Sequence, residues 1–468
     1  MLKKEFYIGY LRWLLSVAAL YWFHAACPAQ ELGLPPFQYF SPEDYKASGR
    51  NWSIVSDSTG VIYVANNSGV LRYDGIAWKL IDLPRKQIAY WVDKDEAGNI
   101  YVGANGEFGI LKVDERQQIY YSSFVDLLEE RFRDFNVVWE IAKDKEGVVF
   151  RSRKYLFKYA NEKISVIEPP VAGARFDVAF TVRNTVYLRI YEVGLGRIDG
   201  NKLIILPNSE LMANIKVNGI YPYGSKEILI ASRYDGMFIY NSGGIRHFKT
   251  QSDQYFIQNK IYDGHHLENG NYAIATMANG IVIITPEGKE VFRFDSSNGL
   301  NNNQTLFVRE IEGQLWIGTK NGIIQMAYDA PFRTVEREFG LNGQITGIFR
   351  IDDQIYVTCN DGFYQLTGTD DQPTFKRINK NLLVDCINAF KYDDRIYVSS
   401  LDGLFYFEGD SAIRLGNFSP RAIHKSSRKG IFLTSEIYFG LYLLDIRQDK
   451  KEFRKIGGFN RLISQIIS

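Results

Sequence analysis

Residues 312–323 read EGQLWIGTKNGI, and this stretch decides the fold. A polar turn precedes a short apolar run that carries Trp316, and a second turn, at Gly322, separates it from another apolar run. Short alternating runs bounded by Asn and Gly predict antiparallel strands joined by a tight turn. The fold then depends on whether this hairpin stands alone or recurs.

The hairpin recurs, and ten copies are found along the chain. The other nine lie at 52–75, 91–113, 139–159, 179–200, 218–240, 264–284, 347–366, 389–407 and 424–445. One large residue of the central strand marks the period: Tyr63, Tyr101, Phe150, Tyr187, Leu229, Tyr272, Trp316, Tyr356, Tyr397 and Phe432. A period of about forty residues with about four short strands is typical of a β-propeller blade.

The repeats predict an all-β protein of the β-propeller class. One ring holds about four to eight blades, so ten copies do not fit a single ring. We therefore predict a seven-bladed ring at 31–341, followed by about three blades of an incomplete second propeller at 342–468. The marker aromatics are expected in the core between neighbouring blades. Three unclosed blades would leave bare apolar faces, which indicates the N-terminal portion of a longer product or closure by other means.

The composition agrees with a large folded protein. Of 468 residues, 46% are hydrophobic and 15% aromatic, which is enough apolar material for extensive cores and excludes a disordered chain. The formal charge is +1, so the sequence gives no indication of a nucleic-acid-binding surface.

The first thirty residues differ from the rest. Lys3 and Lys4 precede an apolar segment, and Cys27 and Ala29 occupy the small-residue positions of a cleavage site. This pattern predicts a signal peptide at 1–30, with a buried N-terminal helix or membrane anchor as the alternative. No later run has the roughly eighteen apolar residues of a membrane span. The mature chain is therefore predicted to be exported, periplasmic or extracellular, without a membrane segment.

Two cysteines remain after the leader, Cys359 and Cys386, in neighbouring repeats. They cannot form a disulfide framework. A single bridge is one interpretation, and two isolated small core residues is the favoured one.

Sequence motifs for catalysis or metal binding are absent. The chain has no G-x-S-x-G, H-E-x-x-H, C-x-x-C or Walker loop. His265 and His266 are the one histidine cluster, and adjacent strand residues point to opposite faces, so they are not expected to share a metal. The segment 93–98, DKDEAG, has Asp93, Asp95 and Gly98 at the positions of a calcium loop, but Ala97 and Ala104 stand where two ligands are needed, so it is interpreted as a turn. We predict no catalytic residue, no cofactor, no metal and no enzyme activity.

The tryptophans form one candidate ligand site. Trp52, Trp91 and Trp139 occupy equivalent positions in the first three repeats, at the start of innermost strands. Such positions lie near the axis of a propeller at one mouth. The three side chains could stack on the sugar rings of a ligand, or pack at the end of the channel.

One segment interrupts the repeats. Residues 122–135 carry Phe124, Leu127, Leu128 and Phe132 at helical spacing, which predicts a short amphipathic helix or turn inserted between blades two and three.

The seventh copy resembles a known repeat. Residues 298–326, NGLNNNQTLFVREIEGQLWIGTKNGIIQM, are similar to the two-component regulator propeller repeat, in which G-L-x-x-N precedes an innermost strand and G-x-L-W-I-G-T-x-x-G-[LI] follows. Residues 40–81 also resemble the start of such sensor ectodomains of Bacteroidetes-type bacteria. The resemblance spans about residues 37–445, although copies three, four and ten depart from the motif.

In that family, two seven-bladed rings precede a triple-tyrosine domain, a membrane helix and a cytoplasmic output module, including those of hybrid two-component sensors. This sequence lacks four of the expected repeats and everything after them. The resemblance therefore implies an extracytoplasmic ligand-sensing region without its output module.

The resemblance implies a small ligand, such as an oligosaccharide, as partner, and admits a homodimer within a full-length sensor. Two alternatives stay open. One is a stand-alone secreted binding or scaffold propeller, and the other is a propeller lyase or hydrolase that acts on carbohydrate.

Overall fold

The computed structural model describes residues 33–296, 300, 302–334, 339–369, 372–378, 385–408, 411–436, 440–447 and 452–457. The predicted signal peptide at 1–30 lies outside the described residues. Among the residues that are described, no helix has the length and apolarity that a bilayer crossing requires.

The ten predicted repeats are ten antiparallel four-stranded sheets, so the all-β prediction is confirmed. We number the sheets 1–10 in chain order. They divide between two compact units, one over Pro35–Phe332 and one that begins at Arg333 and includes Leu34. Leu34 pairs with Thr334 through two backbone hydrogen bonds of 2.9 and 2.7 Å.

The first unit contains sheets 1–7, and each of sheets 1–6 is formed by four consecutive strands. Their bounds are β2 Asn51–Ser56, β3 Ile62–Asn66, β4 Gly69–Tyr73, β5 Trp78–Ile81; β6 Ala89–Lys94, β7 Ile100–Ala104, β8 Phe108–Val113, β9 Ile119–Ser123; β10 Glu140–Lys143, β11 Val148–Arg151, β12 Leu156–Ala160, β13 Lys163–Ile167; β14 Phe176–Val182, β15 Thr185–Ile190, β16 Gly194–Asp199, β17 Lys202–Ile205; β18 Val217–Tyr223, β19 Glu227–Ser232, β20 Met237–Asn241, β21 Gly244–Phe248; β22 Ile261–His266, β23 Tyr272–Thr276, β24 Ile281–Ile284 and β25 Glu290–Phe294.

Sheet 7 joins the two ends of the first unit. Its strands β26 (Thr305–Ile311), β27 (Gln314–Thr319) and β28 (Gly322–Met326) are consecutive, but the fourth is β1 (Phe37–Phe40) from the start of the chain. β1 pairs antiparallel with β28, with Phe40 opposite Ile323. The repeat pattern does not predict this pairing.

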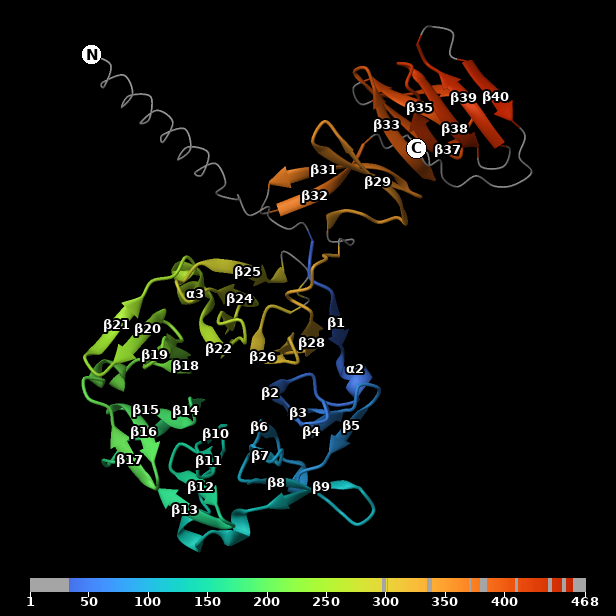
Figure 1. The fold of residues 1–468 in the computed structure, drawn as a ribbon. Coiled ribbons are helices and arrows are strands. Elements are labelled where there is room, and N and C mark those ends of the chain that lie inside the picture. The colour runs from blue at the N-terminus through green and yellow to red at the C-terminus, as the bar shows by residue number, and fades with distance from the viewer. Residues whose placement is uncertain are drawn as a thin grey trace, which may run out of the picture. The chain divides into compact units, whose positions relative to one another are not determined.

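The seven sheets of the first unit are arranged around a common centre, with β2, β6, β10, β14, β18, β22 and β26 innermost (Figure 1). Each innermost strand contacts the next, and β26 contacts β2, so the order of sheets closes on itself. Short helices lie between strands: α2 Pro42–Tyr45, η1 Pro84–Lys86, η2 Val125–Leu127, η3 Glu130–Phe132, η4 Glu210–Ala213 and α3 Asp253–Asn259.

The second unit contains sheets 8–10, each of four consecutive strands. Their bounds are β29 Ile345–Ile351, β30 Gln354–Cys359, β31 Gly362–Thr369, β32 Gln372–Ile378; β33 Cys386–Tyr392, β34 Arg395–Ser400, β35 Gly403–Glu408, β36 Ser411–Gly416; β37 Pro420–Lys425, β38 Ile431–Glu436, β39 Gly440–Asp445 and β40 Glu452–Gly457. Cys359 and Cys386 are both buried and are not joined in a disulfide.

The marker residues lie in the second strands and pack between sheets, as predicted, but they do not share one register. Those that face the following sheet are Tyr63, Tyr101, Tyr187, Leu229, Trp316, Tyr356 and Tyr397. Those shifted by one residue, which face the preceding sheet, are Phe150, Tyr272 and Phe432. Successive strand residues point to opposite faces, so a shift of one residue moves a side chain into the other core.

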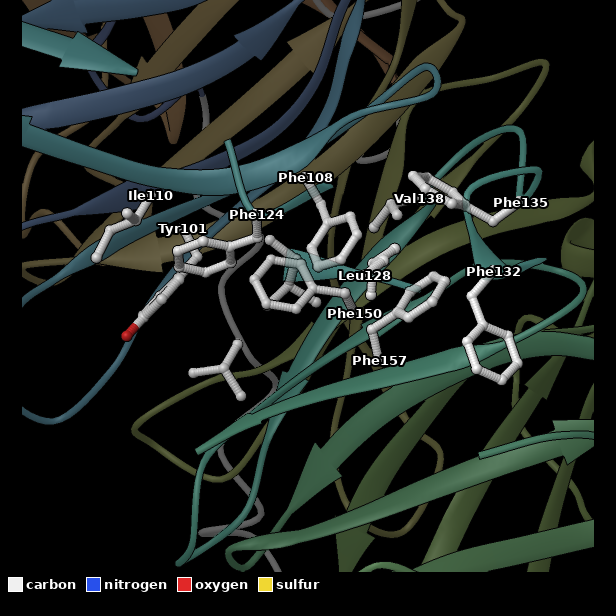
Figure 2. Packing of buried hydrophobic residues seen from close by; sticks show 12 residues of the cluster. Tyr101, Phe108, Ile110, Phe124, Leu128, Phe132, Phe135, Val138, Phe150 and Phe157 are labelled. Atoms are coloured by element: carbon white, nitrogen blue, oxygen red, sulfur yellow. The ribbon is translucent and has the colours of Figure 1, made fainter. Parts of the chain in front are cut away.

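The core between sheets 2 and 3 shows this packing (Figure 2). The Phe108 ring stacks on Phe157, with centroids 4.9 Å apart, and lies 4.8 Å from Phe150. Aromatic pairs of this kind contribute about 0.5–1.5 kcal/mol beyond the area they bury.

The inserted segment 122–135 covers one end of that core. It forms the two 3-10 turns η2 and η3 rather than an α-helix. Phe124, Leu128 and Phe132 are buried as predicted, but Leu127 is 58% exposed and Phe135 is buried in its place. Helical spacing therefore identified the apolar face but not its full membership.

Glycine at the start of third strands permits the close approach of a fourth strand. Gly322 has φ +145°, and a Cβ there would lie 2.7 Å from the carbonyl oxygen of Phe40 in β1. Gly69 has φ +137°, and its Cβ would lie 2.6 Å from the carbonyl oxygen of Ile81. A side chain at either position would separate the two outer strands.

Candidate functional site

A ring of β-bulges lies around the centre of the first unit. In six innermost strands the pairing with the second strand skips one residue. Trp139 takes the corresponding place before β10, where its N–H donates to the carbonyl oxygen of Arg151 at 2.9 Å. The seven residues are Trp52, Tyr90, Trp139, Asp177, Asn218, Tyr262 and Leu306. A bulge re-aims its side chain out of the sheet, and all seven side chains line one cavity.

The register corrects the predicted tryptophan site. Trp52 and Trp139 are equivalent, but Tyr90, not Trp91, matches them in sheet 2. Trp91 is the next residue and pairs with Gly103. The predicted equivalence of the three tryptophans was wrong by one residue in sheet 2: Trp52 and Tyr90 each lie eleven positions before the marker tyrosines Tyr63 and Tyr101, whereas Trp91 lies ten positions before Tyr101. Trp52, Trp91 and Trp139 nevertheless border the same cavity.

We call this cavity the aromatic cavity. Its volume is about 360 Å³, and all seven sheets of the first unit contribute to its lining. Besides the seven bulge residues, the lining comprises Trp91, Glu140, Arg151, Arg153, Val178, Phe180, Lys216, Arg233 and Asp263. Small-molecule sites in proteins usually measure about 300–1,000 Å³, so the cavity is large enough for a small ligand.

Sheets 1–3 supply an aromatic arc to one side of the cavity. The Tyr90 ring lies between Trp52 and Trp139, with centroid distances of 5.1 and 4.7 Å. Trp52 Nε1 donates to Asn67 Oδ1 at 2.8 Å, and the Arg50 guanidinium lies 5.0 Å from the Trp52 ring centre. These contacts fix the rings, which remain partly exposed to the cavity.

Sheets 3–5 supply a charged arc to the other side. The position on the second strand that faces the bulge holds Ala or Gly in five sheets but Arg151 in sheet 3 and Arg189 in sheet 4. Both arginines are 2% exposed. Arg151 pairs with Glu140, and Arg189 pairs with Asp177 at 2.9 Å.

Lys216 completes the network. Its Nζ lies 2.8 Å from Asp177 Oδ2. Burial alone would raise the pKa of Asp177, but Lys216, Arg189 and Arg151 outweigh it and hold the pKa below its ordinary value. The pKa of Lys216 is lowered, chiefly by burial and further by the nearby Arg233, although Asp177 opposes the shift. Asp177 is therefore a charged carboxylate held by two cations.

A second cavity lies further along the innermost strands, and we call it the histidine cavity. Its volume is about 580 Å³, and it shares Trp91 and Phe180 with the aromatic cavity. His265 and His266 both border it, although they leave β22 on opposite faces, as predicted. The pKa of His265 is lowered to about 3 by burial, with smaller contributions from Arg309 and His266.

Arg309 lies at the boundary of the two cavities. Its Nη1 bonds Asp263 Oδ2 at 2.5 Å, and its guanidinium lies 5.5 Å from the centre of Trp91. In the same region the Tyr221 hydroxyl is buried and has no hydrogen-bond partner among the residues that the structure describes.

The segment 93–98 contains the β6–β7 turn, as interpreted from the sequence. The Asp95 carboxylate accepts from the Asn99 backbone N–H at 2.9 Å, Asn99 Nδ2 at 2.8 Å and the Tyr101 hydroxyl at 3.0 Å. Across the described ranges, no group of three or more His, Cys, Asp or Glu side chains is placed to hold a metal ion.

No family model and no curated protein sequence matches this chain. Among solved structures, it is similar to the extracellular domain of the hybrid two-component system BT3049 of B. thetaiotaomicron, at 15% identity and a TM-score of 0.61 over 91% of this chain and 60% of that one. The corresponding domain of BT4673 from the same organism has 15% identity and a TM-score of 0.49, over 91% and 61%. The WD40 β-propeller domain of Doa1 has 12% identity and a TM-score of 0.48, over 63% and 96%.

The chain spans about three fifths of the length of the two B. thetaiotaomicron domains. The likeness to BT3049 shows a shared all-β fold.

Most of the cavity lining was not predicted from the sequence. Tyr90 and Tyr262 are ordinary strand aromatics until the bulge is known, and the charged arc has no local motif. One signal was present: Arg151 and Arg189 stand where the other repeats of the first unit have Ala or Gly.

Proposed function

We propose that this chain is the extracytoplasmic ligand-sensing region of a bacterial signal-transduction regulator, exported by residues 1–30. In this proposal sheets 1–7 form a seven-bladed β-propeller, domain 31–341, and sheets 8–10 belong to a second propeller, domain 342–468. The family is that of the two-component regulator propeller repeat. The similarity to the BT3049 extracellular domain supports the proposal.

The single observation that carries a ligand site is the aromatic cavity. Trp52, Tyr90 and Trp139 present partly exposed rings side by side at the centre of the unit. Rings in this arrangement suit the apolar face of a sugar, and the polar groups opposite suit its hydroxyls. The proposed ligand is a small oligosaccharide, bound with Trp52, Trp91 and Trp139 in the lining.

The binding part is tested by calorimetry on the purified chain with a panel of neutral di- and trisaccharides. We expect one to bind, and Trp52→Ala and Trp139→Ala each to weaken it at least tenfold, about 1.4 kcal/mol. Tyr120→Ala, an exposed aromatic on the outer strand β9, is the matched control and should bind as the parent does. Unchanged binding in both tryptophan variants, with the fold retained, would disprove the site.

The sensor part is tested on the gene. We expect the DNA after codon 468 to continue in frame into further repeats, a membrane-spanning segment and an output module. A stop codon there would instead favour a stand-alone binding protein. The proposal assigns no catalytic step, and clear turnover in a polysaccharide degradation screen would overturn that part of it.

A further inference from the structure

Two arginines of the aromatic cavity have no acidic partner within the described part of the chain. Each carboxylate in the lining is bonded to a cation: Glu140 to Arg151, Asp177 to Arg189 and Lys216, and Asp263 to Arg309. Arg153 and Arg233 also line the cavity, and neither forms an ion pair with any residue that the structure describes.

Arg233 is placed by its backbone and held on an aromatic ring. Its N–H donates to the carbonyl oxygen of Lys216 at 2.8 Å, which brings it beside the charged arc. Its guanidinium lies 5.5 Å from the centre of the Tyr262 ring. The Nε–H is buried, yet it has no hydrogen-bond partner within the described part of the chain. A buried donor that makes no hydrogen bond costs about 1–3 kcal/mol, and more if the group is charged. A ligand acceptor at this position would therefore be strongly favoured.

Arg153, the second arginine without an acidic partner among the described residues, is exposed. It follows Arg151 and Ser152 at the end of β11, and its side chain reaches the same cavity from sheet 3. The proximity of Arg233 already lowers the pKa of Lys216, so the cations of this arc repel one another. An anion placed among them would relieve that repulsion.

We propose that the ligand of the aromatic cavity is an acidic saccharide. Its carboxylate or sulfate binds Arg233 and Arg153, while its ring lies against Trp52, Tyr90 and Trp139. This inference rests on the proposed ligand site and narrows its chemistry. A planar guanidinium donates two parallel hydrogen bonds to a carboxylate or sulfate, which a neutral hydroxyl cannot accept in the same way. A cationic ligand is disfavoured, because all three lining carboxylates are already bonded.

The test compares matched acid and neutral probes by calorimetry on the full chain. The carboxylate pair is digalacturonate and its dimethyl ester, and the sulfate pair is galactose-6-sulfate and galactose. We expect at least one acid to bind tenfold or more tightly than its neutral match. The affinity for that acid should decrease severalfold when NaCl is raised from 50 to 500 mM. The pair that shows the difference identifies the anionic group.

Arginine variants assign the effect to this cavity. Arg233→Gln and, independently, Arg153→Gln should each weaken binding of the acid at least tenfold. Binding of the neutral probe should not change in either variant. Arg153 is exposed, so its variant keeps the test decisive if Arg233→Gln folds poorly. Arg116→Gln, on the exposed β8–β9 turn, is the control and should change neither.

The outcomes separate this inference from the proposed function. Equal binding of acid and neutral probes, lost in Trp52→Ala, would overturn the anionic ligand and keep the site. Binding of neither acid would overturn the anionic ligand, and the neutral saccharide panel would then decide the site. Acid binding that survives both arginine substitutions would also overturn the inference.

Discussion

Sheet 8, the first sheet of the second unit, leaves exposed a repeat position that the sheets of the first unit bury. This position, two residues after the bulge, is 4% exposed at Ile54, 2% at Val92 and 3% at Ile141. In sheet 8, the first of the second unit, the equivalent Ile348 is 68% exposed. Each of the four residues is Ile or Val in the same register, so the local strand pattern does not decide burial.

Closure explains the difference. Ile54 belongs to sheet 1, yet it packs with Phe307 and Trp316 of sheet 7, because the order of sheets closes on itself. Within the second unit, sheet 8 packs on sheet 9 through β29 and β33, and this packing leaves Ile348 largely exposed. A four-stranded sheet has two faces to cover, and a closed series covers both.

Each unit carries its own spectroscopic or chemical probe, which allows the comparison to be tested. The tryptophans after residue 30 all lie in the first unit: Trp52, Trp78, Trp91, Trp139 and Trp316. The two cysteines after residue 30 both lie in the second: Cys359 and Cys386. Tryptophan fluorescence therefore reports unfolding of the first unit, and thiol labelling reports the second.

The largest effect is expected from Phe40→Ala. Phe40 in β1 is 5% exposed and contacts Trp78, Tyr73 and Trp316, with ring centroids 5.2–6.0 Å apart. Its loss should lower the free energy of unfolding of the first unit by about 3–5 kcal/mol, since it leaves a cavity where the unit closes. The measurement is urea unfolding by tryptophan fluorescence. Thiol labelling of the second unit should not change, and a parallel change there would show that the units do not unfold separately.

Ile54→Ala should come next. The side chain fills the core between sheets 7 and 1, so its truncation should destabilise the first unit by about 2–5 kcal/mol. Urea unfolding followed by tryptophan fluorescence measures the loss. A change below about 0.5 kcal/mol would contradict the closed packing of these two sheets.

Thiol labelling of the native protein should be slow. Burial raises the pKa of Cys359 to about 11 and that of Cys386 to about 12. The thiolate is the reactive form, and a pKa raised by two units lowers the thiolate fraction about 100-fold at pH 8. Iodoacetamide labelling should therefore accelerate at least that much in urea. Equal native and denatured rates would show that sheets 8 and 9 are not packed on each other.

Acidification should destabilise the first unit through His265. Its folded pKa, about 3, lies below the unfolded value near 6.5, so the unfolded state takes up a proton first. The stabilisation is complete above pH 6.5 and decreases by up to about 1.4 kcal/mol per pH unit as the pH falls toward 3.

Unfolding free energies measured from pH 7 to 5 test the assignment to His265. His265→Gln should reduce the slope of the unfolding free energy against pH. His247 is an exposed histidine of β21, and His247→Gln should keep that slope. Since the pKa of His266 is also lowered, part of the slope should persist in the His265 variant. Identical slopes in all three proteins would reject the burial of His265.

The smallest effect is expected from Ile348→Ala. Its side chain is largely exposed, so the free energy of unfolding of the second unit should change by no more than about 0.5 kcal/mol. The midpoint of thiol labelling in urea measures it. A loss comparable to that of Ile54→Ala would mean that another surface covers Ile348 in solution.

Much of the fold could be predicted from local pattern. The ten repeats, their strands and the placement of the marker residues between sheets follow from alternation and turn residues, which act over a few positions. The marker register could not be predicted at Phe150, Tyr272 and Phe432, because one inserted or missing turn residue reverses the face of a strand. The pairing of β1 with β28 has no local signal, since it joins segments almost three hundred residues apart.

The candidate site was predicted only in outline. Trp52 and Trp139 lie where the sequence placed them, but the bulge that aims them into the cavity involves hydrogen bonds to a second strand, so Tyr90 was missed. The charged arc was missed entirely, since Glu140, Asp177 and Lys216 come from three different sheets.

The sequence by itself determined the unit of structure: a forty-residue sheet with two apolar faces, repeated ten times, because alternation and turns are short-range properties. Tertiary structure alone decided which of those faces is buried, where β1 completes a sheet, and which side chains meet at the centre. Those outcomes depend on contacts between sheets. Strands with the same pattern gain or lose such contacts according to the sheets that neighbour them.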